Sequence, residues 1–188
     1  MKIATLKIAV FLLAISFTNC SKDEAPIPPL QQLPPITQVG ANTVGCLVNG
    51  EIFLPHQKNP TGTPSTICFY QFVNNKWNFS LGFSNDKQTK LRAVNIASKN
   101  HVLEQGKTYE LISDNGNSLF GNYTIYNGGI SNIDKYVTNG NSIKGELTIK
   151  YLNKQENIIS GTFWFNAVNT NDEKIEIRDG RFDMQYSQ

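Results

Sequence analysis

The sequence predicts an all-β fold, a single antiparallel β-sandwich, with a flattened lipocalin-like β-barrel as the alternative. Two observations support this prediction. Apolar and polar residues alternate with a period of two, as in strands with one buried face and one wet face. Dipeptides typical of tight hairpin turns separate the alternating segments. The clearest alternation lies in residues 76–84, 146–151, 174–178 and 181–186.

From residue 43 onward we expect ten or eleven strands joined by turns. Three dipeptides tolerate positive φ at both central positions and predict two-residue hairpins: Asn49-Gly50 between 43–48 and 51–54, Asn74-Asn75 between 66–73 and 76–84, and Asp179-Gly180 between 174–178 and 181–186. Further strands are expected at 91–98, 108–113, 119–126 and 157–168, with at most a short helical turn near 131–137.

Residues 1–19 have the pattern of a secretory signal peptide. Lys2 and Lys7 give a basic start, and residues 8–17 form an apolar run that is too short to span a bilayer as a mature helix. Cys20 follows directly. A cysteine at this position favours a lipoprotein signal over an ordinary cleavage site, with a plain signal peptide as the alternative.

The stretch Phe17-Thr18-Asn19-Cys20 resembles the lipobox of Bacteroidetes-type lipoproteins. The resemblance implies cleavage before Cys20 and lipidation of its thiol. Lys22, Asp23 and Glu24 resemble the export signal that sends such lipoproteins to the outer face of the outer membrane. We therefore expect a lipid-anchored protein of the cell outer membrane that is exposed on the surface, with a periplasm-facing anchor as the alternative.

Residues 20–38 are expected to be the lipidated cysteine and a linker, followed by one β domain over 39–188. Five of the eight prolines lie in residues 25–38. Because proline lacks an amide donor and favours extended geometry, this segment predicts a semi-rigid spacer of roughly 40 Å when fully extended. Its expected role is to hold the domain clear of the membrane.

Charge and cysteine content narrow the function classes. Without Lys2 and Lys7 the chain has 15 basic and 15 acidic residues, and no basic stripe is present, which argues against a nucleic-acid partner. Cys46 and Cys68 remain besides Cys20. They can form a disulfide that closes a loop of about 23 residues and contributes ~3 kcal/mol, or remain free thiols packed as small apolar groups.

A second resemblance concerns the β domain itself. Residues 42–50, 160–163 and 177–183 are similar to an uncharacterised family of Bacteroidetes lipoprotein domains, over roughly residues 40–185. The shared motifs are hairpins and core positions. The resemblance therefore implies a domain of unknown function and transfers no catalytic residue.

Few residues predict chemistry. The two histidines, His56 and His101, lie in expected loops, and no zinc motif, serine nucleophile motif or EF-hand is present. We expect no cofactor and no metal. Residues 119–140 combine tyrosines with Asn and Gly, a chemistry that suits sugar or peptide binding. Tyr123, Tyr126 and Tyr136 are the candidate ligand-binding residues, with an ordinary core strand and a long loop as the alternative.

The first functional hypothesis is therefore a surface-anchored, non-enzymatic domain that binds a glycan or a protein. The second is a structural or accessory envelope lipoprotein without a ligand of its own. The third is a hydrolase, which would need convergent acids in a pocket.

Overall fold

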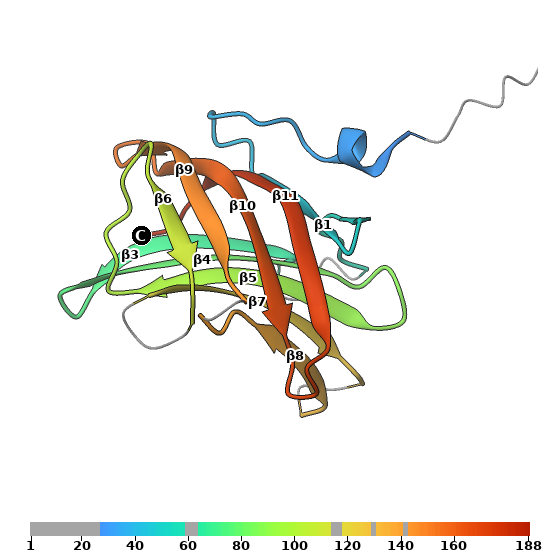
Figure 1. Ribbon diagram of the computed structural model, residues 1–188. Coiled ribbons are helices and arrows are strands. Elements are labelled where there is room, and N and C mark those ends of the chain that lie inside the picture. Colours follow the sequence, from blue (N-terminus) through green and yellow to red (C-terminus); the bar gives the residue numbers. More distant parts are fainter. Residues whose placement is uncertain (1–26, 59–63, 114–117, 129–130, 141–142) are drawn as a thin grey trace, which may run out of the picture.

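The protein is almost entirely β-structure, as the alternation predicts. The computed structural model describes residues 27–58, 64–113, 118–128, 131–140 and 143–188 (Figure 1). One short 3₁₀-helix, η1 (Pro29–Gln32), precedes the strands. The strands are β1 (Thr43–Val48), β2 (Glu51–Phe53), β3 (Thr66–Val73), β4 (Lys76–Asn85), β5 (Leu91–Lys99), β6 (Thr108–Leu111), β7 (Leu119–Tyr126), β8 (Ile133–Val137), β9 (Gly145–Asn153), β10 (Ile158–Val168) and β11 (Lys174–Gln185).

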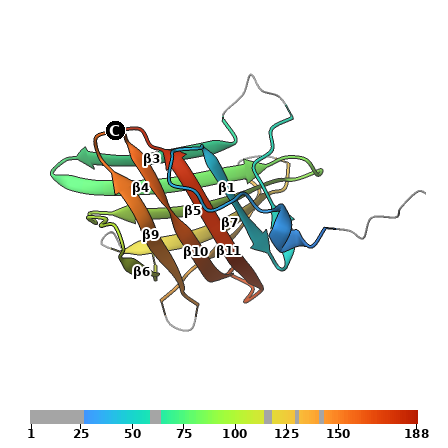
Figure 2. The same cartoon turned by 90° about the horizontal axis from the view of Figure 1, so that it is seen from above.

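The strands form one continuous sheet that folds over into two layers. Their order is β2-β1-β11-β10-β9-β6-β7-β5-β4-β3, and β8 pairs with both β7 and β10. In Figure 2 strands β9, β10 and β11 cross over β3, β4 and β5. The sheet does not close into a barrel. The domain is thus sandwich-like, with β6 and β8 as the connections between its layers.

The antiparallel prediction is wrong at the connection between the layers and at two isolated parallel bridges, His56 with Asn85 and Phe69 with Ser187. Strands β6 and β7 are parallel, and they pair only through Leu111 and Leu119. On the opposite side the C-terminal residues reach β3, because Tyr70 N donates to Ser187 O and Ser187 N donates to Cys68 O, each at 3.1 Å. The core is therefore covered by the two layers and is also bordered by backbone at two edges, at β6 and at the C-terminal residues.

The predicted hairpins at Asn49-Gly50 and Asn74-Asn75 are confirmed, with positive φ at all four positions. The third prediction is wrong. Asp179 and Gly180 lie inside β11, which pairs with β1 and β10 on both sides of them. Asp179 has a φ of 52°, and the register shifts there, as in a β-bulge. The pairing of the flanking residues explains why the chain continues instead of turning.

The helical turn expected near 131–137 is also wrong, because residues 133–137 form strand β8. Tyr136 and Val137 pair with Tyr123 and Asn122 of β7. These partners on β7 lie more than ten residues away in the sequence. The hydrogen bonds that they supply cannot be inferred from the local sequence, so the strand was missed. By contrast, 43–48, 66–73 and 119–126 are strands with the predicted bounds.

Residues 27–41 form a segment, here called the strap, that packs on the outer face of β1 and β11. Leu33 is buried, and the guanidinium of Arg181 donates to the carbonyl of Pro34. The expected free-standing spacer is therefore wrong for residues 27–38. Asp183 is 1% exposed, and its carboxylate fastens the strap by accepting hydrogen bonds from Thr37 Oγ1 (2.6 Å), Val39 N (3.0 Å), Gly40 N (2.8 Å) and Ala41 N (3.2 Å).

Candidate functional site

The three candidate tyrosines do not form one site. Tyr123 and Tyr136 point into the core between the layers, with ring centroids 6.1 Å apart, and burial raises the pKa of both phenols. The hydroxyl of Tyr136 donates to Glu173 Oε2 at 3.1 Å. Tyr126 lines a cavity on the outer face of the same strand. The alternation of a strand separates the tyrosines, since residues 123 and 126 lie on opposite faces.

Cys46 and Cys68 are free, buried thiols in the core, so the disulfide alternative is not realised. The reason is their placement, because Cys46 lies on β1 near Tyr123 while Cys68 lies on β3 near Tyr186. Burial raises the pKa of the Cys68 thiol to about 12 and also raises that of Cys46. Both behave as small apolar side chains.

The predicted anchor residues Cys20, Lys22, Asp23 and Glu24 lie outside the described residues. Within the part that the structure describes, no helix is long and apolar enough to cross a membrane. The same described residues contain no group of three or more His, Cys, Asp or Glu side chains that could hold a metal ion.

The larger candidate site, here called the Asn122 cavity, lies on the outer face of β4, β5 and β7 and has a volume of about 820 Å³. Its floor follows directly from strand pairing. Asn95 pairs with Gly82 on one side and with Asn122 on the other, while Ala93 pairs with Thr124. Glycine and alanine leave space at the centre of this face, and the two asparagines place amide groups side by side there.

The residues that carry polar groups on this floor are largely buried, and several of these groups are not bonded within the fold. Asn122 is 9% exposed and Thr124 is 7% exposed, and both line the cavity. Within the described part of the chain, no hydrogen bond joins the Asn122 amide or the Thr124 hydroxyl to another residue. Ser80 donates to Asn95 Oδ1 at 3.3 Å, which leaves the Asn95 amide nitrogen as a further donor. Asparagine amides and a threonine hydroxyl both donate and accept hydrogen bonds, so these groups can bind a ligand in the cavity.

The rim of the Asn122 cavity is mixed. Ile67, Leu91 and Tyr126 contribute apolar and aromatic surface. His56 Nδ1 lies 2.9 Å from Asp86 Oδ1. Hydrogen bonds lower the pKa of Asp86; the one from the Lys58 amide contributes most, and the one from this imidazole comes second. No lysine or arginine is among the described residues that line the cavity. Its electrostatics therefore fit an uncharged ligand better than a phosphate or another anion.

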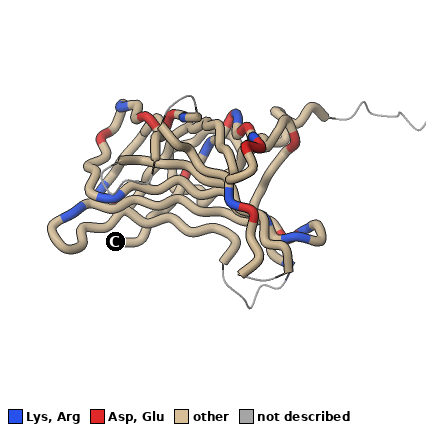
Figure 3. Tube along the Cα trace, turned by 60° about the horizontal axis from the view of Figure 1, so that its bottom comes forward, with Lys and Arg blue, Asp and Glu red and all other residues tan. Residues whose placement is uncertain are grey.

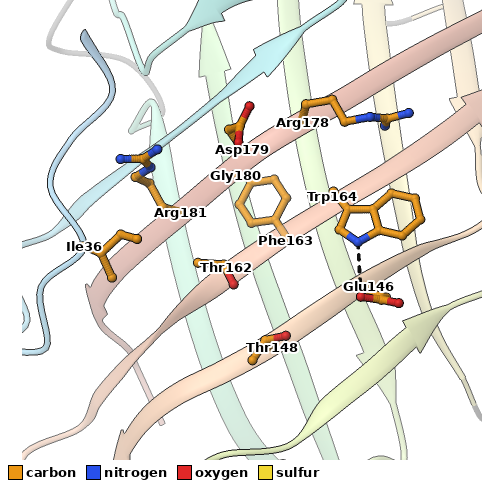
Figure 4. Close-up of a pocket in the computed structure, with 10 residues that line it drawn as sticks. All are labelled: Ile36, Glu146, Thr148, Thr162, Phe163, Trp164, Arg178, Asp179, Gly180 and Arg181. Atoms are coloured by element: carbon orange, nitrogen blue, oxygen red, sulfur yellow. Dashed lines mark hydrogen bonds between the residues drawn. The ribbon is translucent and has the colours of Figure 1, made fainter. Parts of the chain in front are cut away.

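A second, smaller pocket of about 400 Å³, here called the Trp164 pocket, lies on the outer face of β9, β10 and β11 (Figure 4). Figure 4 shows Trp164 and Glu146 on one side and Ile36 of the strap with Arg181 on the other, with Thr162 between them. The indole Nε1 donates to Glu146 Oε2 at 3.2 Å.

Arg178, a charged residue of the Trp164 pocket, is engaged by neighbouring groups of the fold. The guanidinium carbon of Arg178 lies 5.4 Å from the centre of the Trp164 ring. Its nitrogens have four further partners: Phe165 O (3.1 Å), Ile177 O (2.9 Å), Asn166 Oδ1 (2.6 Å) and Glu176 Oε1 (3.2 Å). These contacts stabilise the bulge of β11. The polar groups of the Trp164 pocket therefore have a structural role, and the pocket is a weaker candidate for ligand binding than the Asn122 cavity.

Sequence reasoning did not identify Asn95, Asn122 or Thr124. A signal for them was present, since the outward positions of residues 78–84 are Asn, Ser, Gly and Ser, and those of 93–97 are Ala, Asn and Ala. The outward positions of 146–150 and 174–178 instead carry mostly Glu, Lys and Arg. A solvent-facing strand surface without charged residues is therefore the sequence pattern that would have indicated the cavity.

The comparison with protein families gives one match. Residues 73–184 match DUF6252, a domain of unknown function. The matched stretch contains the floor of the Asn122 cavity and most of the Trp164 pocket. It begins after the strap and does not include it. No curated protein and no solved structure matches the chain.

Proposed function

The chain belongs to the DUF6252 family, whose function is unknown, and we propose that it is a lipid-anchored, non-enzymatic protein of the cell surface that binds a neutral glycan in the Asn122 cavity. The anchor is Cys20, and Lys22, Asp23 and Glu24 direct the protein to the outer face of the outer membrane. The single observation that carries the binding role is the polar, uncharged floor of a large cavity, where Asn95, Asn122 and Thr124 lie side by side on paired strands among the described residues.

The chemistry of the cavity supports a sugar as the ligand. Sugar hydroxyls both donate and accept hydrogen bonds, and asparagine amides and threonine hydroxyls match both roles. Tyr126 and Leu91 offer apolar surface for the carbon-bound face of a sugar ring. The volume of about 820 Å³ falls in the range of ordinary small-ligand sites, roughly 300–1,000 Å³.

The lining of the cavity favours binding over hydrolysis. A glycosidase of the usual kind needs two carboxyl groups that flank the scissile bond. Asp86 is the one carboxylate among the described residues that line the cavity, and it is engaged by His56 and by the amide of Lys58. A single engaged carboxylate at the rim supports a binding protein.

The test is a neutral-glycan array probed with the mature chain, followed by calorimetric titration of any glycan that is retained. Asn122→Leu should reduce affinity about tenfold or more, because it removes two hydrogen-bonding groups. Asn78→Leu is the matched control, since Asn78 lies on β4 outside the cavity. Absence of binding to every neutral glycan would overturn the glycan role and favour an accessory lipoprotein, and equal effects of the two variants would move the site elsewhere.

A further inference from the structure

The strap exposes large apolar side chains to an unusual degree. Ile27 is 61% exposed, Leu30 48%, Ile36 56% and Val39 70%. These four lie within thirteen consecutive residues, whereas the other strongly exposed large apolar side chains of the described chain are spread over the β domain. A cluster of this kind at one edge of a domain marks a surface that meets another apolar phase.

The strap is also free of charge. No Asp, Glu, Lys, Arg or His occurs between Glu24 and Glu51. Figure 3 shows the corresponding stretch of the tube without coloured charges before it reaches the grey N-terminal trace. Surface segments that face only water are rarely uncharged over such a length, since charged residues make up 17% of the whole chain.

The backbone of the strap is held firmly against the domain. Asp183 accepts the four hydrogen bonds from residues 37–41, and Leu33 of the strap is buried against the domain. The exposed apolar side chains are therefore presented on a fixed platform. They do not have to be ordered when they meet a partner, which lowers the entropic cost of the contact.

We propose that the strap lies on the surface of the lipid bilayer, with Ile27, Leu30, Ile36 and Val39 in the interfacial region. This inference rests on the proposed lipid anchor. Ile27 follows Cys20 by seven residues, so the strap begins at most about 25 Å along the chain from the acyl groups. Because the strap has no charge, the contact is apolar and does not require anionic lipids.

The contact sets the orientation of the domain. The strap covers the layer that contains β1 and β11, whereas the Asn122 cavity opens on the outer face of the layer that contains β4, β5 and β7 (Figure 1). With the strap on the bilayer, the cavity faces away from the membrane and the Trp164 pocket, which Ile36 lines, faces toward it. The site proposed for glycan binding is thus the one presented to the medium.

The experiment places single tryptophans on lipidated, full-length protein reconstituted into phosphatidylcholine vesicles with brominated acyl chains. Trp77→Phe and Trp164→Phe remove the two native tryptophans. Leu30→Trp reports on the strap. Val73→Trp is the matched control, because Val73 is also 48% exposed but lies at the far end of β3. Val39→Trp is the second strap reporter if Leu30→Trp does not give folded protein.

The expected result is loss of most strap fluorescence in brominated vesicles and a shift of its maximum to shorter wavelength, with the Val73→Trp signal unchanged. Equal quenching at both positions, quenching at neither, or quenching that needs anionic lipid would overturn the bilayer contact. If mass spectrometry finds no acyl group on Cys20, the anchor and this contact both fail. If Cys20 is acylated and the strap is unquenched, only the bilayer contact fails.

Discussion

The outer faces of the two layers differ in how their polar side chains are satisfied. On β9, β10 and β11, Trp164, Arg178 and Glu146 hydrogen-bond or stack with one another and with the backbone. On β4, β5 and β7, Asn122 and Thr124 are more deeply buried yet have no hydrogen-bonding partner within the described chain. Both faces have a pocket, but Trp164, Glu146 and Arg178 are engaged within the fold, whereas Asn122 and Thr124 remain available to a ligand.

The difference distinguishes polar side chains that stabilise the fold from polar side chains that are available to a ligand. A polar side chain that lines a cavity and makes no bond within the fold is available to a ligand. A group that is fully bonded within the fold contributes to stability and need not meet a ligand. The two faces should therefore respond in opposite ways to substitution, with losses of stability on the strap-covered face and losses of binding on the cavity face.

The largest effect is expected at Asp183, where the strap is fastened. Asp183→Ala should lower the free energy of unfolding by about 3 kcal/mol, because three backbone amides and the Thr37 hydroxyl lose their acceptor. Urea unfolding of the mature chain measures the change. Glu104→Ala, at an exposed carboxylate, is the control. A change below about 1 kcal/mol would show that the strap is not fastened by this residue.

The same carboxylate should make the strap sensitive to acid. Burial alone would raise the pKa of Asp183, but the hydrogen bonds from the strap outweigh it and lower the pKa. A lowered pKa gives stability that is present above the ordinary value of about 3.9 and is lost as the pH falls through the folded value. The stability gap between the parent chain and Asp183→Asn should be constant from pH 7 to 5 and close below that window, as followed by urea unfolding; a gap that widens toward acid would contradict this.

A smaller effect is expected at Arg178. Arg178→Ala should lower the free energy of unfolding by about 2 kcal/mol, since the carbonyl oxygens of Phe165 and Ile177 lose a charged donor and Trp164 loses its stacking partner. Thermal or urea unfolding measures the change, with Lys150→Ala at an exposed position of β9 in the same layer as the control. Glycan affinity should stay unchanged, and a variant that loses affinity without losing stability would make the Trp164 pocket the binding site.

The smallest effect on stability is expected from a matched pair of threonines. Thr124→Val in the Asn122 cavity and Thr162→Val in the Trp164 pocket should each change the free energy of unfolding by less than about 0.5 kcal/mol. Calorimetric titration with the retained glycan should distinguish them, because Thr124→Val should weaken binding roughly tenfold while Thr162→Val should not. The reverse ranking would exchange the roles of the two faces.

The features that the sequence predicted correctly are those that depend on residues close together in the chain. Alternation placed 43–48, 66–73 and 119–126 as strands with the observed bounds, and Asn49-Gly50 and Asn74-Asn75 as hairpins. The same reasoning read Asp179-Gly180 as a turn, although the flanking residues pair with β1 and β10. A dipeptide that favours positive φ serves a bulge as well as a hairpin, and the pairing of distant strands selects between them.

The candidate site was less predictable for the same reason. Residues 119–140 were selected for their tyrosines, yet two of these fill the core, while Asn122, directly before Tyr123, lines the cavity. The cavity floor joins Gly82, Asn95 and Asn122 through strand pairing across forty residues of sequence. No local pattern specifies which strands become neighbours.

Periodicity and turn chemistry were sufficient for the all-β class and most strand bounds, because each depends on near neighbours in the chain. The domain of unknown function was expected from a resemblance to a known family. The assembled fold was required for the folding of one sheet into two layers, the docking of the strap on Asp183, the free state of Cys46 and Cys68, and the polar floor of the Asn122 cavity. These features depend on contacts between residues far apart in sequence, whose formation is governed by the total burial and hydrogen bonding of the whole sheet rather than by any one segment.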